Sequence, residues 1–158
     1  MAGLFGKLPA AGDFVARGLA PGLRPVLDRW ITRHLAEAAR HPELWPETGL
    51  HAVIEAPTGA CALALIPSRD TSGRHFPLAA CAPGSSDRDG VELWASAATP
   101  LLVEAREMGH SADALHAELS ALPDLAAAEP ALVPPVLWAE DSPTAPPEAL
   151  RTLFGEIT

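Results

Sequence analysis

The chain has 158 residues, of which 48% are hydrophobic and 20% charged, so it can fold around a core as one domain. Its formal charge of −9, from 11 basic and 20 acidic residues, argues against binding to nucleic acid or anionic membranes, because both need a basic surface. The N-terminus lacks the pattern of a secretory signal, and no apolar run is long enough to span a bilayer. We therefore expect a soluble, cytoplasmic protein without membrane insertion.

Short apolar runs punctuated by glycine and proline predict strands or extended segments over residues 3–9 and 13–19, around an Ala-Ala-Gly turn. Apolar residues at three- and four-residue steps then predict an amphipathic helix over residues 23–38. Trp30 and Ile31 lie in the middle of its apolar face, so truncating Trp30 is expected to be costly.

The loop after this helix contains Trp45, which we interpret as the tryptophan best placed to contact a partner protein. Two apolar runs over residues 50–56 and 60–67, separated by Pro-Thr-Gly, predict a hairpin whose second strand is buried on both faces. A third strand is expected over residues 75–83, where Pro77 indicates an edge or a bulge.

Helical spacing resumes over residues 91–108, and Pro100 is expected to kink or split this helix. Ser111 is a good N-cap for a further short helix. Residues 134–141 and 146–154 favour one more strand and a terminal helix.

This order of elements predicts an α/β or α+β layered domain, with a mainly antiparallel or mixed central sheet covered by helices. The pattern does not give the strand order. Cys61 and Cys81 lie in apolar surroundings without a CxxC pattern, so we expect buried free thiols rather than a zinc site. The histidines show no HxxxH or HxH pairing, and we expect neither a metal nor a cofactor.

Two segments resemble a known family. They read GLFGKLPAAGDFVARGL over residues 3–19 and IPSRDTSGRHFPL over residues 66–78. Together they are similar to the paired signatures of the TagF/ImpM proteins associated with type VI secretion, and the resemblance covers roughly the first 80 positions. It implies a single TagF-like domain over residues 1–158 with a short C-terminal portion. It also implies a non-enzymatic, post-translational regulator, acting as a repressor by binding a scaffold protein with a forkhead-associated (FHA) domain.

The first segment does not fit a phosphate-binding loop, because only two residues separate its glycines and Leu8 follows Lys7. In the second segment, Ser68, Asp70 and His75 allow an alternative function as a small hydrolase or phosphatase, although no G-x-S-x-G elbow is present. A structural subunit of the secretion apparatus is a further alternative.

We expect the two segments to meet in space, with Arg74 forming charge-assisted hydrogen bonds to Asp13 or Asp70. Such a pair would place Lys7 and Arg69 near a surface that meets an acidic or phosphorylated partner. The candidate binding residues, none of which is assigned a catalytic role, are Lys7, Asp13, Trp45, Arg69, Asp70 and Arg74.

Overall fold

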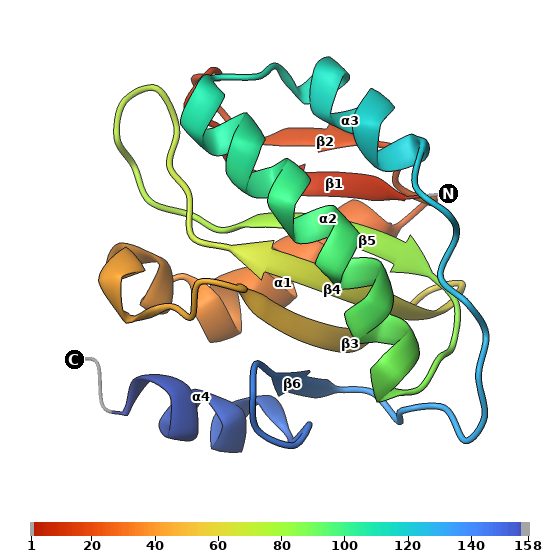
Figure 1. Cartoon of the computed structure of the whole chain (residues 1–158). Coiled ribbons are helices and arrows are strands. Elements are labelled where there is room, and N and C mark those ends of the chain that lie inside the picture. Colours follow the sequence, from red (N-terminus) through yellow and green to blue (C-terminus); the bar gives the residue numbers. More distant parts are fainter. Residues whose placement is uncertain (1, 156–158) are drawn as a thin grey trace.

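The apolar runs pair into one antiparallel sheet of six strands, in the order β2-β1-β5-β4-β3-β6. The structure is a computed structural model that describes residues 2–155 (Figure 1). The strands are β1 (Gly3–Gly6), β2 (Val15–Arg17), β3 (Leu50–Ala56), β4 (Gly59–Ile66), β5 (Leu78–Pro83) and β6 (Val136–Trp138). The prediction of a layered domain with a mainly antiparallel sheet is therefore confirmed.

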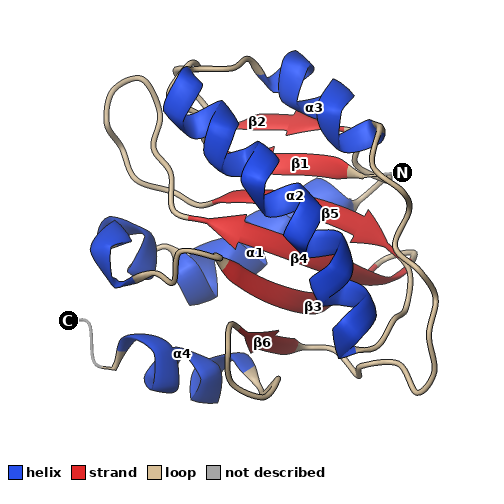
Figure 2. Cartoon of the chain, in the orientation of Figure 1, coloured by secondary structure: helices blue, strands red, loops and turns tan. Residues whose placement is uncertain are grey.

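Helices cover both faces of this sheet (Figure 2). They are α1 (Leu23–Leu35), α2 (Arg88–Met108), α3 (Ala112–Ser120) and α4 (Pro146–Phe154), with 3-10 turns at Ala38–Arg40 and Pro42–Leu44. The α2 and α3 helices pack on one face, and α1 and α4 lie on the other. The result is two apolar cores separated by the sheet.

The β4 strand shows why the sheet is apolar on both sides. Ala62, Ala64 and Ile66 belong to the core beneath α2, whereas alternate residues belong to the core beneath α1. All six residues from Cys61 to Ile66 are buried, as expected for a strand covered on both faces. The buried free thiols predicted for Cys61 and Cys81 are confirmed.

The first helix is shorter than the sequence predicts, because it ends at Leu35 and a 3-10 turn follows. Ile31 is fully buried, but Trp30 is only partly buried and packs against His34. The apolar face therefore centres on Ile31, flanked by Leu27 and Leu35, rather than on Trp30.

In each of two expectations about proline, one of the two alternatives is wrong. Pro77 does not mark an edge, since β5 begins at the next residue, Leu78, and lies between β1 and β4. Pro100 does not split α2, which runs unbroken from Arg88 to Met108. Because proline has no N–H, however, the usual helical hydrogen bond to the carbonyl of Ser96 cannot form.

The two outermost strands, β2 and β6, have three residues each. On the outer side of β6, Leu137 and Thr144 exchange backbone hydrogen bonds at 2.9 and 3.3 Å. Among residues 2–155, no helix has both the length and the apolar character needed to cross a bilayer.

Candidate functional site

Asp70 is the centre of the candidate site, and its side chain is fully enclosed. Its Oδ2 lies 2.8 Å from Arg74 Nε and 3.2 Å from Lys7 Nζ. Its Oδ1 accepts hydrogen bonds from the backbone N–H groups of Ser72 and Arg74, at 2.9 and 3.0 Å. We call Lys7, Asp70 and Arg74 the Asp70 cluster.

These partners account for the acidity of Asp70. Burial of the carboxyl disfavours its charged form, but the hydrogen bonds from the Arg74 backbone and the Lys7 side chain, with the two positive charges, lower its pKa to about 2. Asp70 is therefore ionised at neutral pH. A buried carboxylate with this many donors holds its surroundings in one arrangement.

The turn around Asp70 is local in origin. The N–H of Gly73 donates to Asp70 O at 3.0 Å, and the N–H of Asp70 donates to Arg74 O at 3.1 Å. Gly73 has a φ of 83°, which glycine adopts without strain. The segment between β4 and β5 is thus a closed turn with the Asp70 carboxylate inside it.

Four contacts join this turn to the N-terminal segment. Thr71 donates from its N–H to Ala11 O at 2.8 Å and from its hydroxyl to Pro9 O at 2.9 Å. Arg74 donates to Gly12 O at 3.0 Å, and Lys7 N–H donates to Pro77 O at 3.3 Å. The two segments that resemble a family in the sequence are therefore one structural unit.

Aromatic packing also holds this unit together. The rings of Phe5, Phe14 and Phe76 contact one another, with centroids 4.9–6.1 Å apart. The Lys7 ammonium lies 4.9 Å from the centre of the Phe14 ring. The Lys7 stem therefore runs along an apolar wall while its charge meets Asp70.

Of the two partners proposed for Arg74, Asp70 is confirmed. Asp13 is exposed, and its Oδ1 accepts from the Phe14 N–H at 2.7 Å. It lies beside Gly12, whose carbonyl Arg74 binds, but forms no ion pair among the described residues. The Arg74 side chain is 63% exposed, whereas Lys7 is buried. Lys7 lies near the surface, as expected, but Asp70 and the Phe14 ring cover its charge.

Arg69 is exposed, and within residues 2–155 its side chain forms no hydrogen bond or ion pair. It flanks Asp70, and its backbone bridges to that of His75. Arg69 and Arg74 therefore present positive charge beside the closed turn.

The prediction of a surface-available Trp45 is wrong, since only 7% of this residue is exposed. Its Nε1 donates to Ala38 O at 2.8 Å, and its ring packs against Phe154. These contacts anchor the loop after α1 and, through Phe154, the C-terminal helix. Neither contact is visible in the local sequence.

Sequence reasoning also missed the backbone half of the site. The carbonyls of Pro9, Ala11 and Gly12 accept three of the hydrogen bonds that join the segments, although their side chains carry no chemistry. The glycine and proline residues of this stretch were the sequence feature that could have indicated these contacts, because such residues restrict the backbone conformation and so the direction of the carbonyls.

The fold and its joined segments define a class: a two-core α+β domain in which a Gly-rich N-terminal strand pair is fastened to the β4–β5 turn by a buried carboxylate. The family described as "TagF N-terminal domain, Type VI secretion system-associated" matches residues 3–122. The chain therefore belongs to the TagF family and is a type VI secretion system-associated protein. The match extends past the first 80 positions and includes α2 and α3.

A solved structure shares this fold. It is the crystal structure of PA0076 from Pseudomonas aeruginosa PAO1, with a TM-score of 0.61 and 25% sequence identity. The similarity covers 94% of this chain and 75% of that chain. No curated protein matches the chain at a significant level.

Proposed function

We propose that this protein is a non-enzymatic regulator of type VI secretion that acts by binding another protein through Arg69 and Arg74. The observation that carries the proposal is the exposed Arg69, which has no side-chain partner within residues 2–155 and lies beside a turn that the Asp70 cluster holds rigid. Loops held on a rigid scaffold commonly carry binding residues. An exposed arginine without an internal partner is suited to an acidic or phosphorylated surface.

The partner we propose is the FHA-domain scaffold protein of the secretion system, and the direction of regulation is repression. Both follow from resemblance to the TagF family. The chain's own contribution is the basic surface at Arg69 and Arg74 in an otherwise acidic protein of formal charge −9. Such a local exception to the overall charge orients an acidic partner during encounter.

The geometry of Ser68 gives the hydrolase alternative little support. Ser68 is buried, and its Oγ has no hydrogen-bond partner among the described residues, while His75 is exposed. Asp70, the proposed orienting acid, is instead occupied by Lys7 and Arg74. A nucleophilic serine needs a base within hydrogen-bond reach.

Binding to the purified scaffold tests the proposal. Arg69→Glu should weaken binding by about tenfold or more, because it replaces an attractive contact with a repulsive one. The melting temperature should stay unchanged, since the Arg69 side chain has no partner in the part of the chain that the structure describes. Arg29→Glu is the matched control, because Arg29 is an exposed arginine on α1 and the charge change is the same.

Equal loss of binding in both variants would show a general charge effect and contradict the proposed site. Full binding by Arg69→Glu would also contradict it. The alternative functions have their own signatures. Ester or phosphate hydrolysis that disappears in Ser68→Ala would establish an enzyme, and stable co-purification with baseplate subunits would favour a structural role.

A further inference from the structure

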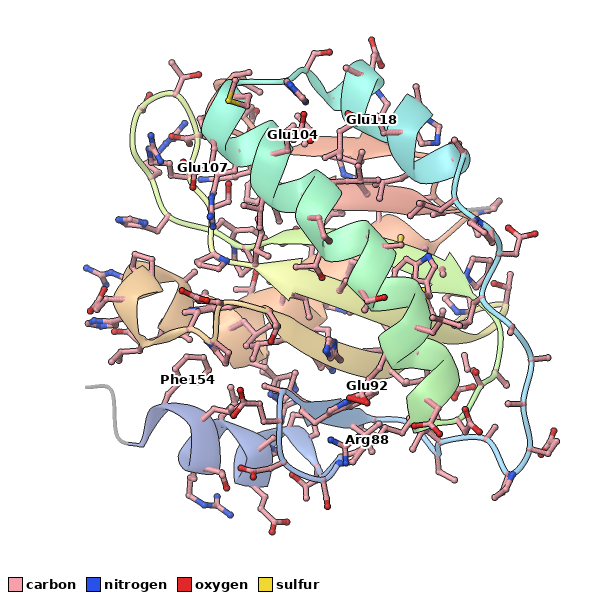
Figure 3. The ribbon with its side chains drawn as sticks, in the orientation of Figure 1. Arg88, Glu92, Glu104, Glu107, Glu118 and Phe154 are labelled. Carbon is pink, nitrogen blue, oxygen red and sulfur yellow. The ribbon has the colours of Figure 1, made fainter. Side chains whose placement is uncertain are left out.

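A groove of about 920 Å³ lies beside α2, between this helix and the beginning of β3. Its wall on α2 extends from Arg88 and Glu92 to Glu104 and Glu107, which Figure 3 shows near opposite ends of the helix. Glu47 and Glu140 complete the rim. We call this feature the acidic groove.

The charge in the acidic groove is strongly unbalanced. Its lining contains five glutamates and one arginine. This arginine, Arg88, already has partners, because it donates hydrogen bonds to the Glu92 side chain at 3.3 Å and to the carbonyl of Glu140 at 3.0 Å. Within residues 2–155, the side chains of Glu47, Glu104 and Glu140 have neither an ion pair nor a hydrogen bond.

Two buried polar side chains in the same lining each have an atom without a hydrogen-bond partner among the described residues. His51 is 8% exposed and Thr99 is 7% exposed. His51 Nδ1 and Thr99 Oγ1 have no hydrogen-bond partner among the described residues. An unsatisfied buried polar atom typically costs about 1–3 kcal/mol, so a partner that supplied hydrogen bonds to these two atoms would recover part of that free energy.

The lining is rich in acceptors. Ser96 also lines the groove, and its carbonyl has lost its helical donor because residue 100 is proline. Burial lowers the pKa of His51; Glu92 raises it and Arg88 lowers it further, so His51 is neutral at physiological pH and adds no positive charge. A ligand that fits this lining brings donors and positive charge.

The groove also has apolar surface between its hydrogen-bond acceptors, and this limits which kinds of ligand fit. Ala95, Val103 and Met108 line the groove, and Met108 is 70% exposed. Lysine and arginine side chains combine an aliphatic stem with a cationic head, so they match a surface of alternating methylene and carboxylate groups. An inorganic cation would leave the apolar part uncovered.

We propose that the acidic groove binds a basic peptide segment of a partner protein, whose arginine or lysine side chains pair with Glu47, Glu104 and Glu140. The segment's backbone runs along the wall formed by His51, Ser96 and Thr99. This interaction uses other residues than the proposed scaffold contact at Arg69 and does not depend on it.

A second copy of the chain is the competing occupant, because α1 exposes Arg24, Arg29 and Arg33. That contact would join unlike surfaces, and repetition would give a ring or an open filament. Each copy also carries a formal charge of −9, which opposes self-association. These two costs favour a different protein as the occupant.

The test measures binding of a short peptide that carries arginines separated by alanines, by fluorescence anisotropy at low and high salt. A matched peptide has glutamate in place of each arginine. The groove variant combines Glu47→Gln, Glu104→Gln and Glu140→Gln. The control variant combines Glu55→Gln, Glu129→Gln and Glu148→Gln, which are exposed glutamates outside the groove and remove the same charge.

We expect the arginine peptide to bind and the glutamate peptide not to bind. The groove variant should lose about tenfold in affinity, as expected for three exposed charge pairs, while the control variant changes less than about twofold. In NMR spectra, binding should shift the amide resonances of Thr99 and His51.

Three results would overturn the proposal: no binding of the arginine peptide, equal weakening in both variants, or resonance shifts confined to other parts of the sheet. Sedimentation of the protein alone provides the remaining check. Concentration-dependent association that the groove variant abolishes would make a second copy the occupant. Loss of peptide binding with intact scaffold binding would separate this groove from the Arg69 site.

Discussion

The Asp70 cluster and the acidic groove differ in whether their buried polar groups have hydrogen-bond partners. In the cluster, a fully enclosed carboxylate has two cationic partners and two backbone donors. In the groove, buried polar atoms of Thr99 and His51 have no partner among the described residues, and three rim glutamates are unpaired. Both regions carry acidic residues, but in the groove only Glu92 and Glu107 have internal partners, Arg88 and Arg106.

This difference distinguishes residues that stabilise the fold from residues that bind a partner. A group that is satisfied inside the fold stabilises the fold, and its removal leaves its partners unpaired. A buried polar group without a hydrogen-bond partner lowers the stability of the free protein. Its removal should therefore leave that stability unchanged or raise it. The sign of a substitution's effect on stability therefore identifies the role of a residue.

The largest expected effect is at Asp70. Asp70→Asn should give the greatest fall in melting temperature of the variants considered, because it leaves Lys7 and Arg74 without their shared anion. Asp13→Asn is the control, since Asp13 is exposed and forms no ion pair among residues 2–155. Thermal unfolding followed by circular dichroism compares the two, and an Asp70→Asn protein that melts like the parent would remove the bracing role.

The same carboxylate predicts a pH dependence. Folding lowers the pKa of Asp70 from 3.8 to about 2, so the unfolded state binds the proton more tightly. Its contribution to stability is thus fully present above about pH 4 and is lost as the pH falls towards about 2. Melting temperatures should converge between parent and Asp70→Asn across this window, and a constant difference would contradict the assignment.

Glycine substitutions test the junction between the two family segments. Gly6 has a φ of 139°, and an added Cβ would collide with the carbonyl oxygen of Pro77. Gly6→Ala should therefore cost more than about 2 kcal/mol of unfolding free energy. Gly12→Ala is the control, because Gly12 has open space around it and no positive φ, and it should change stability by less than about 0.5 kcal/mol. Urea denaturation measures both.

The smallest expected effect has the opposite sign. Thr99→Val removes a buried hydroxyl that has no partner within residues 2–155 and keeps the branched shape, so it should stabilise the free protein by about 1 kcal/mol. Thr32→Val, on the exposed face of α1, should change stability by less than about 0.5 kcal/mol. A destabilised Thr99→Val protein would mean that the hydroxyl is already satisfied, and the groove would lose one of its two buried acceptors.

Local patterns predicted much of this molecule. The hairpin of β3 and β4, the N-cap at Ser111 and the final helix all follow from spacing within a few residues. The pairing of Arg74 with Asp70 was equally accessible, because both residues belong to one turn. Interactions of short range in the sequence leave short-range signals.

Features assembled from distant segments were not predicted. The burial of Trp45 depends on Ala38 and on Phe154 at the other end of the chain. The acidic groove draws its lining from residues 47–51, from α2 and from residues 139–140. No short stretch of the sequence contains these three parts together, so the local hydrophobic periodicity cannot predict the groove.

The short outer strands limit how other proteins can attach. A long exposed strand offers a row of backbone groups to which an incoming chain can add by β-augmentation. Here β2 and β6 offer three residues each, and the outer side of β6 is already occupied by Thr144. These two edges therefore offer little backbone for strand addition, so we expect partners to be selected mainly by side-chain chemistry.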